Sequence, residues 1–358
     1  MPCARTVARR PSLMNPASRH SPARQRGRVL LAVVVLLLLA AAAGAAALWH
    51  LYQRPLPVRG ERVEILVPAG ASARTIAKSL REQGVDVNVE LFVAAARWTE
   101  VTQRLRAGRY EVTRGMRLAD VLERLRRGET LKERLTIVEG WTFRAMRLAL
   151  AQHALLKRDT EKMSDAQVLA AVGSAETHPE GLFAPDTYVF DAGSSDLDIL
   201  RRAYREQQDR LSRAWEERAD GLPLKSPYEA LILASIVEKE TGQVQERPRI
   251  AGVFINRLRA GMLLQTDPTV IYGLGEQFDG NLRRRDLAAD TPYNTYTRAG
   301  LPPTPIALPG RASIEAALRP EQTRALYFVA RGDGTSQFSD SLAEHNRAVV
   351  KYQLGGKR

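Results

Sequence analysis

The sequence predicts an α+β protein with a single transmembrane helix near its N-terminus and two folded parts after it. Three observations predict this: one long apolar run without charges, a strand–glycine–helix pattern that recurs, and an apolar helix late in the chain. The 358 residues are 44% hydrophobic and 26% charged, which is the balance of a folded protein. A chain of this length favours two domains over one.

The apolar run covers residues 29–48 and carries no charged side chain. Twenty helical residues at about 1.5 Å each span the ~30 Å hydrocarbon layer of a bilayer. Trp49 and Tyr52 follow it and supply the aromatic residues expected at a membrane interface. A cleaved signal peptide is the alternative, but the run is long for one and lacks a clear small-x-small cleavage site. We therefore expect a membrane anchor.

Positive charge is concentrated ahead of this run. The net charge is +13, and residues 1–28 hold seven arginines and no acid, so 13 − 7 leaves +6 for the rest. Arginines keep their side of a membrane segment in the cytoplasm, which places the remainder outside the inner membrane and argues against nucleic acid as a partner. The single cysteine, Cys3, excludes an internal disulfide framework.

A pattern of strand, glycine and helix occurs three times after the apolar run. Three glycines align, with an apolar residue six positions later and a leucine ten positions later: Gly70, Ile76 and Leu80; Gly115, Val121 and Leu125; Gly140, Met146 and Leu150. Positions four apart share a helix face, so each unit predicts a short strand, a glycine turn and an amphipathic helix.

This pattern resembles the LysM module, a small carbohydrate-binding unit in which a strand is followed by helices. The second copy, with residues 108–110 ahead of it and 125–128 behind it, resembles the module most. The alternative is that these glycines end turns in an ordinary α+β domain.

Residues 180–188, with the sequence EGLFAPDTY, combine two aromatic residues with a proline. Such a loop could pack over a sugar-binding cleft, but a hydrophobic plug between two domains is the interpretation that the pattern favours. A charged helix with one apolar stripe follows, marked by Leu197, Leu200, Tyr204, Leu211 and Trp215.

The candidate catalytic helix begins at residues 226–229, Ser-Pro-Tyr-Glu, which read as a capping box with proline at the first helical position. Residues 230–237 are apolar on every face, so the helix is buried, and we expect Gly242 to end it as a C′ glycine. Glu238 and Glu240 lie at its end. Burial raises the pKa of a carboxyl group, as a general acid near neutral pH requires. The alternative is a glutamate that leaves the core and pairs with Arg247 or Arg249.

Periodicity does not choose between these two glutamates. They lie roughly 200° apart around a helix, so both cannot face one cleft. Each also continues an apolar stripe, Glu238 that of Leu231 and Ala234, and Glu240 that of Leu233 and Ile236.

Several further motifs follow in a fixed order: residues 234–241, 253–258, 261–262, 264–273, 293–296 and 300–303. Together with residues 180–188 and the LysM-like part, they resemble the YceG-like family of endolytic murein transglycosylases over nearly the whole exported chain. The resemblance implies an inner-membrane lyase that cuts nascent peptidoglycan strands internally. Lytic transglycosylases use one glutamate, commonly followed by Ser or Thr. Glu240-Thr241 matches that motif and Glu238-Lys239 does not, so the resemblance favours Glu240, with Glu238 second.

Polar residues in two turn-rich segments are candidates for a substrate groove: Gln265, Thr266, Asp267, Asn294 and Tyr296. Their amide and hydroxyl groups would suit the N-acetyl groups of sugars, although Asp-Pro also simply marks a turn. Asp267 would be the second carboxylate if the enzyme were a hydrolase. No histidines at metal-ligand spacing and no phosphate-binding loop occur, so no cofactor or metal is implied.

The expected architecture has five parts: a cytoplasmic tail at 1–28, a transmembrane helix at 29–48, a LysM-like peptidoglycan-binding region at 49–160, a connecting region at 161–225 and a catalytic domain at 226–358. The expected partners are glycan strands, the inner membrane and, from the resemblance alone, glycan polymerases. A membrane-anchored scaffold that only binds peptidoglycan and a muramidase-type hydrolase remain as alternatives.

Overall fold

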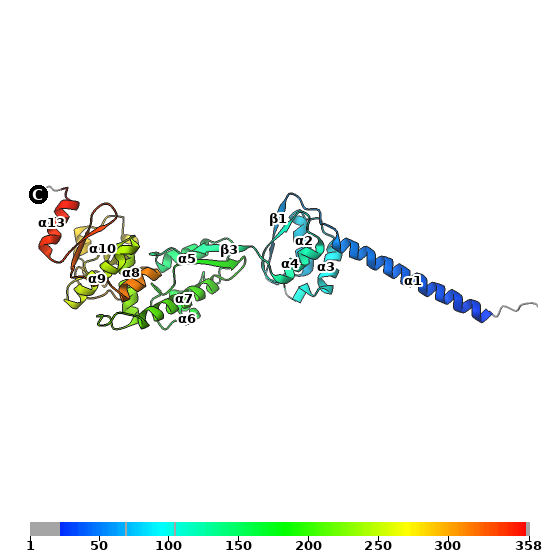
Figure 1. Ribbon diagram of the computed structural model, residues 1–358, viewed down its shortest axis with the longest axis horizontal. Coiled ribbons are helices and arrows are strands. Elements are labelled where there is room, and N and C mark those ends of the chain that lie inside the picture. The colour runs from blue at the N-terminus through cyan, green and yellow to red at the C-terminus, as the bar shows by residue number, and fades with distance from the viewer. Residues whose placement is uncertain (1–21, 69, 104, 356–358) are drawn as a thin grey trace, which may run out of the picture. The chain divides into compact units, whose positions relative to one another are not determined.

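The computed structural model describes residues 22–68, 70–103 and 105–355. Cys3 and most of the expected tail at 1–28 lie outside these ranges. The chain divides into two compact units. One comprises the chain up to Val63 with Ser72–Arg104 and Val112–Arg127, and the other comprises Glu64–Ala71, Leu105–Glu111 and the chain from Gly128 onward. Secondary structure is mixed α and β (Figure 1), as the sequence predicts.

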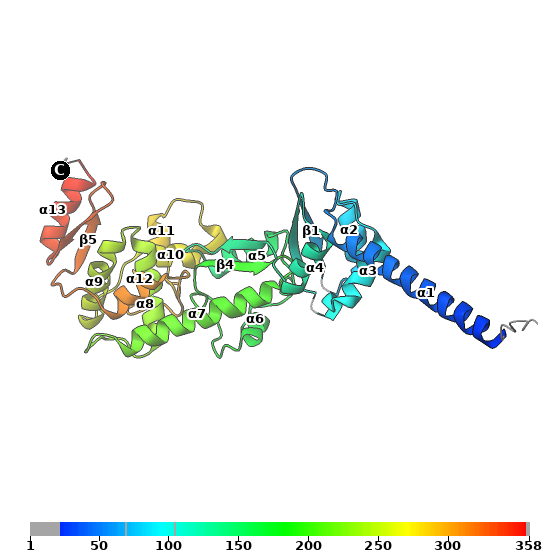
Figure 2. The same ribbon diagram turned by 45° about the vertical axis from the view of Figure 1, so that its right-hand side comes forward.

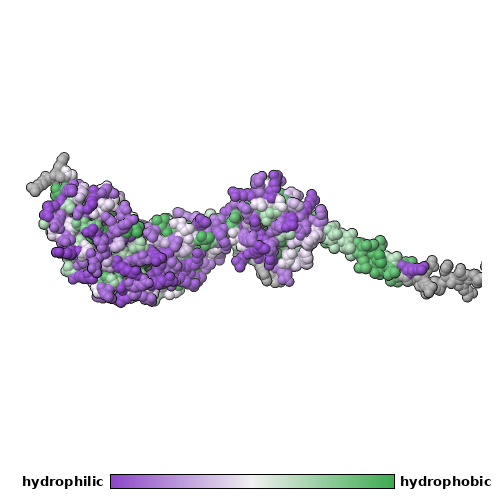
Figure 3. Space-filling view, in the orientation of Figure 1, coloured by the Kyte–Doolittle hydropathy of each residue, from purple (hydrophilic) through white to green (hydrophobic). Residues whose placement is uncertain are grey.

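The first unit is helical and begins with α1 (Pro22–Gln53). Among the described residues, one stretch, Arg28–Gln53, is long and apolar enough to cross a membrane, and none of it is buried. Figure 3 shows its hydrophobic surface. The other helices of the unit are α2 (Ala73–Glu82), α3 (Val89–Trp98), the short η1 (Val101–Gln103) and α4 (Leu118–Arg127). The expected apolar helix is confirmed.

The threefold strand–glycine–helix pattern is confirmed. Each of three strands leads through a glycine into a helix: β1 (Arg62–Val67) into α2, β2 (Gly108–Thr113) into α4, and β3 (Lys132–Thr136) into α5 (Phe143–Gln152). Gly70, Gly115 and Gly140 have φ of 73°, 89° and 77°, a left-handed conformation that glycine adopts without steric cost. β1 and β2 are neighbours in a two-stranded sheet.

The third copy of the pattern belongs to a different core from the helices of the first two. Met146 and Leu150 of α5 are buried in one hydrophobic cluster with the apolar residues of the candidate catalytic helix. The division after Arg127 therefore separates α4 from β3, whereas the sequence places a boundary at residue 160. Because the three copies are similar in sequence, the sequence does not reveal that the helix of the third copy packs with α8 and not with the first two helices.

The second unit contains the EGLFAPDTY segment, which forms a buried plug. β3 pairs in antiparallel fashion with β4 (Thr187–Asp191), Thr136 opposite Thr187. Just before β4, Leu182 and Phe183 are buried, and the Phe183 ring stacks on Phe143 with centroids 4.8 Å apart. The burial that the plug interpretation predicts is confirmed, although the segment lies within one unit and not between two. The alternative of a loop with its aromatic residues over a cleft is wrong for Phe183 and Tyr188, which are both buried.

Helix α8 (Pro227–Glu240) is the centre of this unit. It packs against α7 (Asp196–Glu216), α9 (Arg247–Arg259) and α12 (Arg311–Leu318), and all its residues from Ala230 to Val237 are buried. Figure 2 shows α8 between these helices. The Ser226 hydroxyl caps the Glu229 N–H at 3.2 Å, as expected.

Two details of α8 differ from expectation. The Glu229 carboxylate accepts from the Lys225 N–H at 2.7 Å instead of completing a capping box with Ser226. The helix ends at Glu240, because Thr241 is extended with φ −146° and ψ 137°. Gly242 has no positive φ, so the expected C′ glycine is wrong. The extended Thr241 ends the helix directly after Glu240.

The remaining elements of the second unit surround this centre. They are α6 (Asp165–Val172), η2 (Val244–Glu246), α10 (Asp267–Leu274), η3 (Gly275–Gln277), α11 (Arg284–Ala288), the hairpin of β5 (Tyr327–Ala330) and β6 (Ser336–Ser339), and α13 (Leu342–Tyr352).

Candidate active site

Glu240 closes the last turn of α8 beside the start of α10. Its Oε1 accepts a hydrogen bond from the Thr266 hydroxyl. Thr266 is 2% exposed and directly precedes the first residue of α10. The carboxyl group therefore lies at the junction of two helices, with one hydroxyl donor holding its orientation.

Burial raises the pKa of Glu240 to about 7. The hydrogen bond from Thr266 opposes this rise, the negative charge of Asp267 adds to it, and the Arg257 guanidinium opposes it. A carboxyl group with this pKa exists in both forms near neutral pH. It can donate a proton and take one back in the same catalytic cycle.

Thr266 is fixed by a second loop. Its N–H donates to the Thr295 hydroxyl at 3.1 Å, and the Gln265 N–H donates to the Thr295 carbonyl at 3.0 Å. The Thr269 hydroxyl lies 2.9 Å from that of Thr295. The structure thus brings together the two polar segments that the sequence predicts as a groove floor.

Asn294 organises this second loop from inside. Its side chain is fully buried, and its Nδ2 donates to the carbonyls of Asp286, Leu287 and Ala289 at 3.1, 3.0 and 2.6 Å. Its Oδ1 accepts from the Tyr296 N–H at 2.9 Å. Its polar atoms therefore face the protein, whereas the sequence suggested contact with sugar.

Three of the predicted residues reach the surface next to Glu240. Gln265 and Asp267 are exposed, Tyr296 is half-buried, and the Tyr296 hydroxyl donates to Asp267. Gln265 has a φ of 48°, an uncommon left-handed conformation for a residue with a side chain. Backbone strain of this kind is concentrated at functional sites, and here it directs the chain between the buried Leu264 and Thr266.

Glu238 occupies a different environment. Its side chain is 4% exposed, and its Oε1 accepts from the Arg247 guanidinium at 2.9 Å. Its Oε2 accepts from the Gly310 N–H at 2.9 Å. Arg247 also reaches Glu139 at 3.4 Å. Both oxygens are thus committed to internal partners, and the pairing with Arg247 that the sequence suggested falls on this glutamate.

The chain as a whole is similar to known proteins. A family model described as the YceG-like family matches residues 65–351. The chain belongs to the YceG-like family. An endolytic murein transglycosylase of Bacillus subtilis is 33% identical over 315 residues, which cover 81% of this chain and 84% of that protein.

Two further proteins match a similar share of this chain. An endolytic murein transglycosylase of Streptococcus pneumoniae is 26% identical over 81% of this chain, and the match spans 58% of that longer protein. A crystal structure of a YceG-like protein from Listeria monocytogenes, 31% identical, matches 80% of this chain and 98% of its own with a TM-score of 0.50.

Arg257 is a residue of the candidate active site that the sequence did not single out. It is 7% exposed on α9, and its guanidinium donates to the carbonyls of Leu326 and Leu264, both at 2.7 Å. Its charge acts on Glu240. An available signal was its spacing, because it extends the buried stripe of Ile250, Val253 and Phe254 on the same helix face.

Glu180 is a second missed residue. It is 3% exposed, and its two oxygens accept from the Phe143 N–H at 2.8 Å and the Tyr272 hydroxyl at 3.1 Å. Burial raises its pKa to about 7. It connects the start of α5 to α10, the helix that begins beside Glu240. The signal available in the sequence was its place at the start of the EGLFAPDTY segment, two residues before the apolar Leu182.

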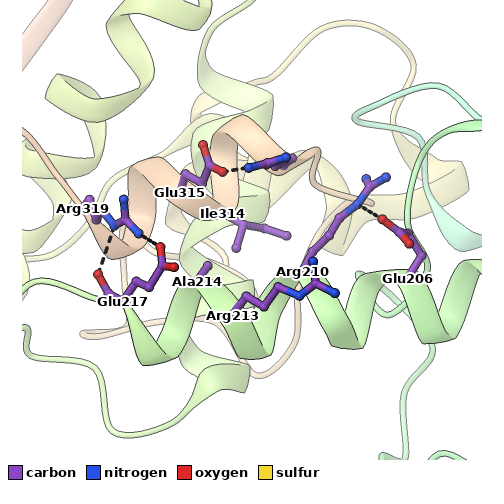
Figure 4. A pocket seen from close by; sticks show the side chains of 9 residues that line it. Glu206, Arg210, Arg213, Ala214, Glu217, Ile314, Glu315 and Arg319 are labelled. Carbon is purple, nitrogen blue, oxygen red and sulfur yellow. Dashed lines mark hydrogen bonds and ion pairs between the residues drawn. The ribbon is translucent and has the colours of Figure 1, made fainter.

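A pocket of about 220 Å³ lies between α7 and α12 (Figure 4), away from these residues. It is lined mainly by charged side chains that pair with one another, including Arg319 with Glu217, Arg311 with Glu315 and Arg210 with Glu206. None of the predicted site residues lines it. Its charges are largely neutralised within the pocket.

Proposed function

We propose that this chain is an endolytic peptidoglycan transglycosylase. It cleaves the β-1,4 bond between N-acetylmuramic acid and N-acetylglucosamine in nascent glycan strands and forms a 1,6-anhydro end, which limits strand elongation. The observation that carries this proposal is the buried Glu240 carboxyl group with a pKa of about 7 beside a polar surface. The endolytic murein transglycosylases among its relatives support it.

The first step is proton donation. Protonated Glu240 gives its proton to the glycosidic oxygen while the bond from that oxygen to C1 of the muramic residue breaks, so that positive charge develops at C1. The N-acetylglucosamine side leaves with a free hydroxyl group. Because the Thr266 hydroxyl donates to Oε1 of Glu240, Oε2 is the oxygen that carries the proton toward the substrate.

The second step returns the proton. The C6 hydroxyl of the same muramic residue attacks C1 and forms the C1–O6 bond, and its proton passes to the Glu240 carboxylate. The glutamate is then ready for another cycle. Because the attacking group belongs to the sugar, no bound water and no second carboxylate are required, and proximity is provided by the substrate. One glutamate is therefore sufficient.

The neighbouring residues take binding or positioning roles in this proposal. Gln265, Asp267 and Tyr296 are at the surface and would contact the N-acetyl and hydroxyl groups of the sugars. Thr266 positions Glu240. Glu238 and Asn294 have internal partners, so they support the helix end and the loop from behind.

The proposed location of the enzyme rests on α1. We propose that this helix anchors the chain in the inner membrane as a single pass, with the N-terminus cytoplasmic and the catalytic part periplasmic. Its length and its full exposure support a span, and a signal sequence has the same properties. The LysM-like part, residues 49–160, is proposed to hold glycan strands, and glycan polymerases are the proposed neighbours. Residues 161–225 connect it to the catalytic part from 226 to 358.

Analysis of cleavage products tests the proposal. The full chain in detergent is incubated with purified peptidoglycan, and the new strand ends are identified by mass spectrometry for the wild type, Glu240→Gln and Asp267→Asn. We expect anhydro-muramic ends from the wild type, none from Glu240→Gln, and fewer ends of the same anhydro type from Asp267→Asn. Reducing muramic ends would indicate a hydrolase, and binding without cleavage by the wild type would indicate a scaffold.

A further inference from the structure

An exposed aromatic cluster lies where α1 meets the rest of the first unit. Trp98, the last residue of α3, lies against Trp49 and Tyr52 of α1, with ring centroids 6.5 and 5.9 Å away. Trp49 and Tyr52 are 5.8 Å apart. Trp98 is nevertheless 69% exposed and Trp49 is 55% exposed. Figures 1 and 2 both show the end of α3 beside the end of α1. Most of this aromatic surface is uncovered.

One edge of the exposed face of α3 is apolar, while Glu90 and Arg97 on the same side are exposed. Phe92 and Ala96 face the interior of the unit and are buried. Leu91, Ala94 and Trp98 are spaced three and four apart, so they share another face, where Leu91 is half-buried and the other two are exposed. The exposed apolar surface of α3 is concentrated at Trp98, beside the rings of Trp49 and Tyr52.

The position of Trp98 beside the end of α1 indicates what this aromatic surface contacts. The charge-free residues 29–48 account for about 30 Å of helix, which is the thickness of the hydrocarbon layer. Trp49 and Tyr52 then lie at headgroup level, where tryptophan and tyrosine are enriched because their rings are amphipathic. Trp98 contacts both rings, so it lies at the same depth.

We propose that Trp98 is a membrane-interface residue, and that the cluster of Trp49, Tyr52 and Trp98 holds the first unit on the outer surface of the bilayer. The inference rests on the proposed anchoring of α1. Arg54 and Arg97, both exposed, adjoin the cluster in sequence. Their guanidinium groups match the phosphates of lipid headgroups.

This contact has a consequence for the enzyme. A single helix followed by a loose linker leaves the orientation of the following unit free, whereas a second interfacial contact on α3 fixes it relative to the bilayer. The first unit would then remain close to the surface at which nascent glycan strands emerge.

Fluorescence quenching by brominated lipids tests the inference. The chain has four tryptophans, so three single-tryptophan forms of the full chain are prepared that retain Trp98, Trp49 or Trp215, with phenylalanine at the other positions. Each is reconstituted in phosphatidylethanolamine–phosphatidylglycerol vesicles with and without acyl chains brominated near the headgroup. We expect Trp98 emission to be quenched as strongly as that of Trp49, and Trp215 emission to be unchanged.

The controls separate this inference from the anchoring itself. Quenching of Trp49 with Trp98 behaving like Trp215 would overturn the interfacial contact and leave the anchor intact. If neither Trp49 nor Trp98 is quenched, the anchor fails and the inference fails with it. A Trp98 signal that responds to soluble glycan strands and not to brominated lipid would make it a sugar-stacking residue, which also contradicts the inference.

A second comparison avoids multiple substitutions. In the otherwise natural chain, Trp98→Ser should reduce the quenched part of the total emission, and Trp215→Ser should reduce only the unquenched part. The opposite assignment would overturn the inference. Circular dichroism confirms that each variant is folded.

Discussion

The end of α8 holds two glutamates, two residues apart, in opposite environments. Both carboxylate oxygens of Glu238 accept hydrogen bonds, one from the Arg247 guanidinium and one from the Gly310 N–H. Glu240 is half-buried, and the Thr266 hydroxyl is its bonded neighbour. For Glu240, desolvation with a hydroxyl as the bonded partner leaves the protonated form accessible. In the proposed mechanism these different partners separate a structural role for Glu238 from a chemical role for Glu240.

The largest expected effect is on the rate of cleavage. Glu240→Gln removes the group that donates and accepts the proton, which contributes about 10²–10⁴-fold in general acid–base catalysis. We expect a loss of that order in the rate of anhydro-end formation while the protein remains folded. Time courses of strand shortening measure the rate, and thermal unfolding monitors the fold. Wild-type rates in the variant would remove Glu240 from the chemistry.

The next effect concerns stability and falls on the other glutamate. Glu238→Gln leaves the buried Arg247 guanidinium with Glu139, at 3.4 Å, as its remaining carboxylate partner, and breaking a buried ion pair typically costs up to about 3–5 kcal/mol. We expect the midpoint of chemical denaturation to fall accordingly. Because the cost comes from a buried cation that has lost its nearer partner, the double variant Glu238→Gln with Arg247→Met should regain part of it. An unchanged midpoint in the single variant would show that the pair does not stabilise the helix end.

A third effect concerns the pH dependence of stability that comes from Glu240. The pKa of Glu240 rises from 4.5 to about 7 on folding, so the folded protein binds the proton more tightly. Its contribution to the free energy of unfolding is full below about pH 4.5 and is lost as the pH rises to about 7. Relative to the wild type, Glu240→Gln should therefore gain about 1–3 kcal/mol in stability between about pH 5 and about pH 8.

Urea denaturation of both proteins at the two pH values measures this difference. Glu180 titrates in the same range, and because it is present in both proteins its contribution cancels. A constant difference across the pH range would mean that Glu240 has no raised pKa.

The smallest effect concerns the donor to Glu240. Thr266→Val removes the hydroxyl that favours the carboxylate form, so the pKa of Glu240 should rise further by up to about one unit. The decline in activity at high pH should shift upward accordingly. Thr266→Ser retains a hydroxyl group and is the matched control, with a profile close to the wild type. Identical profiles for valine and wild type would show that Thr266 does not influence the proton.

The sequence predicts elements better than their partners. Strand, glycine and helix follow one another around Gly70, Gly115 and Gly140 as expected, because turn chemistry and helical periodicity are local. That α5 packs with α8 depends on contacts between distant segments, which local patterns do not encode.

The site shows the same limit. Periodicity put Glu238 and Glu240 on equal apolar stripes, and only the three-dimensional positions of Arg247 and Thr266 distinguish their environments. Asn294 and Glu180 likewise have partners far away in the chain or in backbone groups. A polar residue type indicates that a hydrogen bond will form, but it does not reveal whether the partner is the protein or a substrate.

The most direct test of the central claim uses isotopically labelled water. Peptidoglycan is digested by the full chain in H₂¹⁸O, and the new muramic ends are examined by mass spectrometry. If Glu240 directs the C6 hydroxyl of the sugar to C1, the new ends are anhydro forms that contain no ¹⁸O. New muramic ends that carry one ¹⁸O atom would show that water is the nucleophile, and would contradict the single-glutamate mechanism.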